Sequence, residues 1–260
     1  MTQAALDRFF DELHGWALGR SVPWRTVAYG DHPDQALDLY GEDAGHEVLV
    51  LVLHGGFWRA SFTRRNTTAL SVALSEAGWP VANVEYRRLG PGRYRASLDD
   101  VRAARERLGS FERVVSVGHS TGAQLALWLA AEGAADAAVA LAGVCDLEAA
   151  AADGLGDNAV VEFLGGLPDE VPDAYRQADP AARVPLGVPQ VVVHGVEDDR
   201  VPADRGRQYV QLASSAGDDC RLVEVEGDHF APIDPRSAAW PTVLAAVASV
   251  ATNPARAVGP

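Results

Sequence analysis

Residues 113–131 read RVVSVGHSTGAQLALWLAA, and this stretch decides the fold. Its first part, Arg113 to Val117, is rich in β-branched residues, as a buried strand is. A helix is predicted over 121–131, directly after the pentapeptide GHSTG at 118–122. A G-x-S-x-G pattern between a strand and a helix predicts a sharp, strained turn that exposes the serine hydroxyl above the sheet. We therefore predict that Ser120 is a nucleophile, with a merely structural Gly-Ser turn as the alternative.

The same alternation of strands and helices continues on both sides of this stretch. Val48 to Leu53 is apolar without interruption, which is typical of a central strand buried on both faces. Further strands are predicted over 25–29, 35–40, 81–85, 137–142, 189–194 and 221–225. Further helices are predicted over 65–77, 96–108, 203–214 and 237–250, after an amphipathic helix on Leu6, Phe9, Phe10, Leu13, Trp16 and Ala17. Such alternation predicts a mostly parallel sheet with helices on both faces.

Residues 146–187 interrupt the alternation. They show weak periodicity and contain several Gly and Pro residues. A long irregular stretch inside a compact domain is usually functional, as a lid is. We expect a single domain over 1–260 with a lid-like insertion at about 146–187.

The composition excludes several classes of protein. The chain of 260 residues carries 36 acidic and 22 basic side chains, all of the latter arginine, and a net charge of −14. This negative charge argues against nucleic-acid partners and against an anionic membrane surface. No apolar run approaches the roughly 20 residues of a membrane-spanning helix, and residues 1–18 lack a secretory signal, so a cytoplasmic location is expected. Cys145 and Cys220 match no metal or redox spacing and are expected to be buried free thiols. The sequence leaves open whether the protein forms a homodimer.

A serine hydroxyl needs a base, and the seven histidines offer one good candidate. His229 follows strand 221–225, so it shares the carboxyl edge of the parallel sheet with Ser120. The other histidines are expected in exposed early segments (His14, His32 and His46) or in structural positions at strand ends (His54, His119 and His194).

The base must be oriented by an acid from a third loop on the same edge. The loop after strand 189–194 contains three consecutive carboxylates, Glu197, Asp198 and Asp199. Composition does not choose among them. Any of the three gives the chain order serine, acid, histidine.

The loop after strand 48–53 reads His54-Gly55-Gly56-Phe57-Trp58 and suits an oxyanion hole. Paired glycines allow backbone N–H groups to turn toward a substrate without obstruction by a Cβ atom. We predict Gly56, Phe57 and Thr121 as the N–H donors, with a tight Gly-Gly turn as the alternative.

Five ordered motifs together resemble the α/β-hydrolase superfamily, in particular its H-G-G-x-W branch of kynurenine formamidase-like and hormone-sensitive-lipase-like esterases. The resemblance spans about residues 45–250. It rests on HGGFW at 54–58, EYRR at 85–88, GHSTG at 118–122, the segment 194–202 and His229-Phe230. In the pattern H-G-x-x-D-x-x-V-P the aspartate falls on Asp198, which the resemblance therefore implies as the acid. Phe57 departs from the third glycine of the lipase-like form, which favours the formamidase-like group, and Thr121 stands where alanine is commoner.

The resemblance implies an α/β-hydrolase fold and a serine hydrolase that cleaves a small carboxylic ester or amide through an acyl-serine, with no metal or organic cofactor. N-formylkynurenine is one candidate substrate by resemblance. Candidate pocket residues for this small-molecule substrate are Trp58, Phe163, Leu164, Leu167 and Tyr175, with packing of the insertion as the alternative.

Arg87 and Arg88 could bind a substrate carboxylate, but an ion pair with nearby acids is the favoured interpretation.

Two other functions are alternatives to a small-molecule hydrolase. A peptidase of the prolyl-oligopeptidase type is one, although that group usually carries a large extra domain. A non-catalytic binding protein on the same fold is another, against which the retained Ser120, Asp198 and His229 argue.

Overall fold

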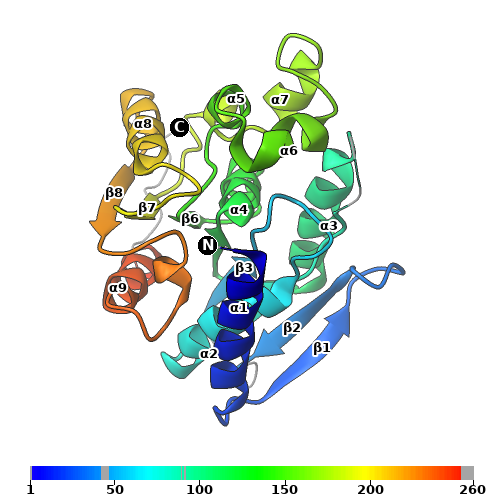
Figure 1. Cartoon of the computed structure of the whole chain (residues 1–260). Coiled ribbons are helices and arrows are strands. Elements are labelled where there is room, and N and C mark those ends of the chain that lie inside the picture. Colours follow the sequence, from blue (N-terminus) through cyan, green and yellow to red (C-terminus); the bar gives the residue numbers. More distant parts are fainter. Residues whose placement is uncertain (1, 42–46, 89, 91, 253–260) are drawn as a thin grey trace.

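The computed structural model describes residues 2–41, 47–88, 90 and 92–252, so His46 lies outside the described residues. Within these ranges eight strands form one sheet in the order β1-β2-β4-β3-β5-β6-β7-β8 (Figure 1). The strands are β1 (Trp24–Ala28), β2 (Ala36–Tyr40), β3 (Val48–Leu53), β4 (Val81–Val84), β5 (Arg113–His119), β6 (Ala137–Leu141), β7 (Gln190–Gly195) and β8 (Cys220–Val225). The pairs β1–β2 and β2–β4 are antiparallel and the other pairs are parallel. The prediction of a mostly parallel sheet is confirmed.

Helices cover both faces of this sheet. One face carries α1 (Gln3–Leu18), α2 (Thr68–Glu76), which follows a 3-10 turn at Arg64–Thr67, and α9 (Trp240–Ala251). The opposite face carries α3 (Tyr94–Arg107), α4 (Thr121–Ala131) and α8 (Ala203–Ser215). Each predicted helix is present within a few residues of its expected bounds.

The central strand β3 shows how the sequence builds two cores at once. Because side chains alternate across a strand, its leucines and its valines face opposite ways. Leu49, Leu51 and Leu53 lie in the core with α3 and α4, whereas Val50 and Val52 lie in the core with α1, α2 and α9. All five are at most 1% exposed, as expected for a strand buried on both faces.

The insertion is more regular than its sequence indicates. Residues 146–187 contain the helices α5 (Leu147–Ala152), α6 (Leu155–Leu164) and α7 (Pro172–Ala178) and a 3-10 turn at Ala181–Arg183. Gly156, Asp157 and Asn158 adopt left-handed backbone angles inside α6, so its regular part is short. Short helices separated by such a kink leave no continuous 3.6-residue pattern, which is why the periodicity is weak.

The register of the parallel strands brings the candidate loops together. Leu53, the last residue of β3, pairs with Gly118 of β5, so the HGGFW loop begins beside the turn at Ser120. Strands β6, β7 and β8 follow in order, and their loops leave the same carboxyl edge. None of the helices in the described ranges has the length and apolar character to cross a membrane.

Candidate active site

Ser120 lies on the predicted sharp turn between β5 and α4. Its backbone angles are φ 54° and ψ −121°, a strained conformation for a residue with a side chain, which confirms the predicted strain. The turn is held because Ser120 N donates to Leu141 O at 2.9 Å and Ser120 O accepts from Val144 N at 3.0 Å. The Ser120 side chain makes no capping hydrogen bond to α4, so the start of the helix does not bind its hydroxyl.

Both glycines of the pentapeptide are required by close backbone approach. A Cβ atom on Gly118 would lie 2.1 Å from Gly122 O, and one on Gly122 would lie 2.2 Å from Leu53 O. At this turn β5, α4 and the end of β3 therefore lie too close together for a residue with a Cβ atom at position 118 or 122.

His229 and Asp198 form the second half of the arrangement. His229 Nδ1 lies 2.8 Å from Asp198 Oδ2, and since a carboxylate only accepts, Nδ1 carries the proton. This tautomer leaves the lone pair on Nε2, the nitrogen that a general base needs. His229 and Ser120 line the same pocket and are each 2% exposed.

The loop after β7 selects one carboxylate of the three. The Asp198 side chain is fully buried, whereas Glu197 and Asp199 are exposed. Its Oδ1 accepts from the N–H groups of Arg200 and Val201, both at 2.9 Å. These bonds fix the carboxylate against His229.

His194 is a second contact of Asp198 that the sequence did not reveal. Its Nε2 lies 3.2 Å from Asp198 Oδ2 and 2.9 Å from Val201 O. Burial by itself raises the pKa of Asp198, but hydrogen bonds from His194 and His229 outweigh it and hold that pKa well below its usual value. Asp198 is therefore an anion at any pH at which His229 could act.

The other histidines have structural partners or lie apart. His119 Nε2 donates to the carbonyl of His229 at 3.0 Å, and burial, followed by the nearby charge of His229, lowers the pKa of His119 to about 3. His32 is exposed, while His14 is half-buried rather than exposed as expected. Among the histidines that the structure describes, only His229 thus combines an orienting carboxylate with a place in the pocket of Ser120.

His54, the first residue of the predicted oxyanion loop, is held by contacts with the EYRR motif. Its ring stacks on Tyr86 with centroids 4.4 Å apart, and its Nε2 lies 2.9 Å from Glu85 Oε1. Burial and then the charge of Arg88 lower the pKa of His54 to about 3, so the ring is neutral. The EYRR motif therefore supports the HGGFW loop through a buried network.

The loop itself carries unusual backbone. Phe57 has φ 50° and Gly56 has φ 120°, and a Cβ atom on Gly56 would lie 2.2 Å from the Phe62 side chain. In the described part of the chain, the N–H groups of Gly56, Phe57 and Thr121 have no protein acceptor. They are free to bind a substrate oxygen.

The two arginines after β4 are held in ion pairs. Arg87 donates to both oxygens of Asp100 at 2.7 and 2.8 Å. Arg88 is paired with Glu85 and lies 3.5 Å from Asp34. The interpretation of these arginines as ion-pair partners is confirmed.

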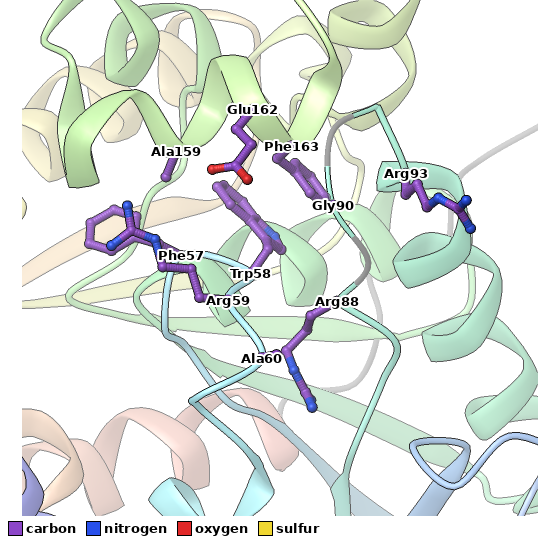
Figure 2. Close-up of a pocket in the computed structure, with 10 residues that line it drawn as sticks. All are labelled: Phe57, Trp58, Arg59, Ala60, Arg88, Gly90, Arg93, Ala159, Glu162 and Phe163. Atoms are coloured by element: carbon purple, nitrogen blue, oxygen red, sulfur yellow. The ribbon is translucent and has the colours of Figure 1, made fainter.

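Two pockets adjoin the loop, with Phe57 lining both. The smaller holds Ser120 and His229 and has a volume of about 30 Å³. The larger, of about 240 Å³, lies between the HGGFW loop and α6, where Figure 2 shows Trp58 beside Glu162 and Phe163.

The predicted substrate-binding residues divide between this pocket and the core. Trp58 and Phe163 stack with centroids 4.0 Å apart and both line the larger pocket. Tyr175 is only 1% exposed and its hydroxyl donates to Gly166 O, so it packs the insertion, as Leu164 does. Leu167 is 45% exposed. Burial of Tyr175 removes the side chain from substrate contact, which corrects that expectation.

The structure adds pocket residues that local sequence patterns did not single out. Leu6 and Phe10 of α1 and Phe62 after the HGGFW loop line the pocket that contains Ser120. The apolar stripe of α1 was visible in the sequence, but a stripe does not identify the surface that it covers.

In the described residues, the cysteines are the candidate thiol sites, and the cysteines, histidines and acidic side chains are the candidate metal ligands. Cys145 is buried and Cys220 is half-buried, and both are free thiols. Among the described residues, no group of three or more His, Cys, Asp and Glu side chains could hold a metal ion.

Comparisons with known proteins agree with this architecture. A relative from Meyerozyma guilliermondii, a kynurenine formamidase, is 31% identical over 106 residues, which are 40% of this chain and 41% of that protein's length. Among solved structures, a bacterial heroin esterase has a TM-score of 0.74 at 21% identity, covering 96% of this chain and 91% of its own. The esterase LipW from Mycobacterium marinum has a TM-score of 0.72 at 19% identity, covering 94% and 85%. At these identities the structural likenesses establish the α/β-hydrolase fold alone.

The match to a family model is more extensive. Residues 86–237, more than half of the chain, match the prolyl oligopeptidase family. This range includes the Ser120 turn, the Asp198 loop and His229 on the sheet edge described above. The chain belongs to the prolyl oligopeptidase family and has the α/β-hydrolase fold.

Proposed function

We propose that the protein is a serine hydrolase that cleaves small carboxylic esters or amides through an acyl-Ser120 intermediate, as a carboxylesterase or an arylformamidase. The observation that carries the proposal is the 2.8 Å bond between His229 Nδ1 and Asp198 Oδ2 in the pocket of Ser120. A strained serine, an oriented imidazole and a buried carboxylate are the three parts that nucleophilic acyl transfer requires.

The reaction proceeds in two steps. His229 Nε2 takes the proton of Ser120 Oγ as that oxygen attacks the carbonyl carbon, and the N–H groups of Gly56, Phe57 and Thr121 bind the resulting oxyanion. The bond to the leaving alcohol or amine then breaks, and the leaving group takes the proton from His229. Water then attacks the acyl-serine with His229 as the base, and this step releases the acid and restores Ser120.

The larger pocket suits an aromatic leaving group. The stacked rings of Trp58 and Phe163, each 6% exposed, form an apolar part of its lining, and the Glu162 carboxylate faces the same space (Figure 2). Glu162 makes no side-chain hydrogen bond or ion pair within the described residues, so it can accept from an amine or hydroxyl of the ligand. This supports an aryl ester or an aryl formamide, and the kynurenine formamidase relative makes N-formylkynurenine a substrate to test.

The test is hydrolysis of p-nitrophenyl acetate together with labelling by a fluorophosphonate probe. Wild type should hydrolyse the ester and be labelled, and Ser120→Ala should lose both. Ser215→Ala is the matched control, because Ser215 is exposed at the end of α8 and should behave as wild type. Folded wild-type protein that neither hydrolyses the ester nor takes the label contradicts the proposal.

The family match supports peptide hydrolysis as a second candidate. The two candidates differ in the bond attacked. Comparison of kcat/KM for p-nitrophenyl acetate, N-formylkynurenine and a proline p-nitroanilide peptide separates them, and preference for the peptide would favour the peptidase.

A further inference from the structure

The N-terminal helix α1 forms a wall of the pocket that contains Ser120. Leu6 and Phe10 line that pocket together with Ser120 and His229, although more than 100 residues of sequence separate them. Figure 1 shows α1 beside α2 on the same face of the sheet. The helix therefore contributes directly to the space in which the reacting carbonyl must sit.

Aromatic rings close this space around α1. The Phe10 ring lies 5.6 Å from that of Phe230 and 6.4 Å from that of Phe62, both edge-on. Arg200 lies over the Phe230 ring at 5.2 Å and lines the same pocket. The volume open to the centre of a water molecule is about 30 Å³ in this pocket, against about 240 Å³ in the larger one.

The wall is anchored along the whole helix. Leu6, Phe10, Leu13 and Ala17 are each at most 7% exposed, and Asp11 pairs with Arg65 at 2.9 Å. Because the same apolar stripe continues past the pocket, α1 is held by contacts that do not touch the substrate. The pocket thus has a fixed boundary on this side.

We propose that Leu6 and Phe10 set the length of the acyl group and restrict the enzyme to formyl- and acetyl-sized acyl chains. The proposal rests on the serine-hydrolase function proposed above. The acyl carbon bonded to Ser120 lies inside the small pocket, while the roughly 240 Å³ beyond Phe57 takes the leaving group. The enzyme is therefore selective on the acyl side and permissive on the leaving-group side.

Two series of esters test this division. In the first, p-nitrophenyl acetate, butyrate and hexanoate vary the acyl chain, and in the second, acetate esters of different phenols vary the leaving group. A misplaced methylene costs roughly 10-fold or more in such a pocket, so wild-type kcat/KM should fall at least about 100-fold from acetate to hexanoate. It should vary far less across phenols with similar pKa values.

Variants of α1 locate the cause. Phe10→Ala should raise the hexanoate-to-acetate ratio of kcat/KM at least about tenfold, because it removes the ring that blocks the chain. Leu6→Ala should act in the same direction and serves where Phe10→Ala does not fold. Leu13→Ala is the control, since Leu13 is buried on the same stripe but does not line the pocket. It should lower Tm and leave the ratio unchanged.

The outcomes are distinct. Wild type that hydrolyses hexanoate as well as acetate overturns the acyl-length proposal while the serine-hydrolase proposal stands. A ratio raised equally by Leu13→Ala also overturns it, because α1 would then act by moving as a unit. Activity that is unaffected by Ser120→Ala overturns the proposed function itself.

Discussion

Replacing Gly122 by alanine should damage the site through backbone displacement alone. A Cβ atom there would lie 2.2 Å from Leu53 O and 2.5 Å from His54 O, and ordinary contact begins at 3.4 Å. The start of α4 must therefore move by about 1.2 Å away from the end of β3. No side chain that takes part in the proposed chemistry is altered.

Two quantities should change together. Thr121 N–H, a proposed oxyanion donor, is adjacent to the substituted residue, and a displacement of about 1 Å costs roughly 100-fold in rate. Overpacking of this kind destabilises a protein by about 1–3 kcal/mol. For a chain of this size each kcal/mol lowers Tm by about 2–4 °C, so a fall of roughly 2–12 °C is expected.

The assay combines kcat/KM for p-nitrophenyl acetate with Tm measured by circular dichroism. Gly15→Ala is the matched control, because Gly15 lies inside α1 with nothing within 4 Å of an added Cβ atom. That control should raise stability by roughly 0.5–1 kcal/mol without changing kcat/KM. A Gly122→Ala protein with wild-type activity and Tm would refute the tight contact between α4 and β3.

Three further predictions follow from buried ionisable groups. Asp198→Asn should lower kcat for p-nitrophenyl acetate about 10³–10⁴-fold, because it no longer fixes the tautomer of His229. The pKa of Asp198 is depressed in the folded protein, so wild type should lose stability relative to this variant as pH falls below about 4, which a series of Tm measurements against pH would show. Burial raises the pKa of Asp179 to about 7, so the stability present below about pH 4 is lost as pH rises toward 7, and Asp179→Asn should abolish this decline in a Tm–pH series; an unchanged slope would contradict it. Burial raises the pKa of Cys145 and brings that of Cys220 to about 12, so neither thiol should react with Ellman's reagent near pH 8 until guanidinium unfolds the chain.

The parts of the fold that were predictable are those that short stretches specify. The run Val48 to Leu53 and the stretch 113–131 gave correct strands, turn and helix, because β-branched runs and the GHSTG turn act within a few residues. The insertion was less predictable, since the left-handed residues 156–158 interrupt its helical pattern. The prediction that Tyr175 binds substrate is wrong for a related reason: an aromatic residue in an irregular stretch fits a pocket or a core equally well, and Tyr175 is buried in the core.

The candidate site divides in the same way. Ser120 and His229 are predicted from their places after parallel strands, whose carboxyl ends share one edge. The choice of Asp198 over its neighbours needed a family resemblance, because three adjacent carboxylates are indistinguishable by type. In the structure the difference is burial and contact with His229, which depend on how the loop after β7 folds.

The sequence by itself determined the alternating α/β architecture, the strained serine turn and the order of serine, acid and histidine, because each depends on neighbours within a few residues or on strand order. Only the tertiary structure decided that His194 also contacts Asp198 and that Leu6 and Phe10 close the space over Ser120. Those contacts join residues from separate elements. They depend on which face of the sheet α1 covers and on the path of the loop after β7, and these are properties of packing that no local pattern encodes.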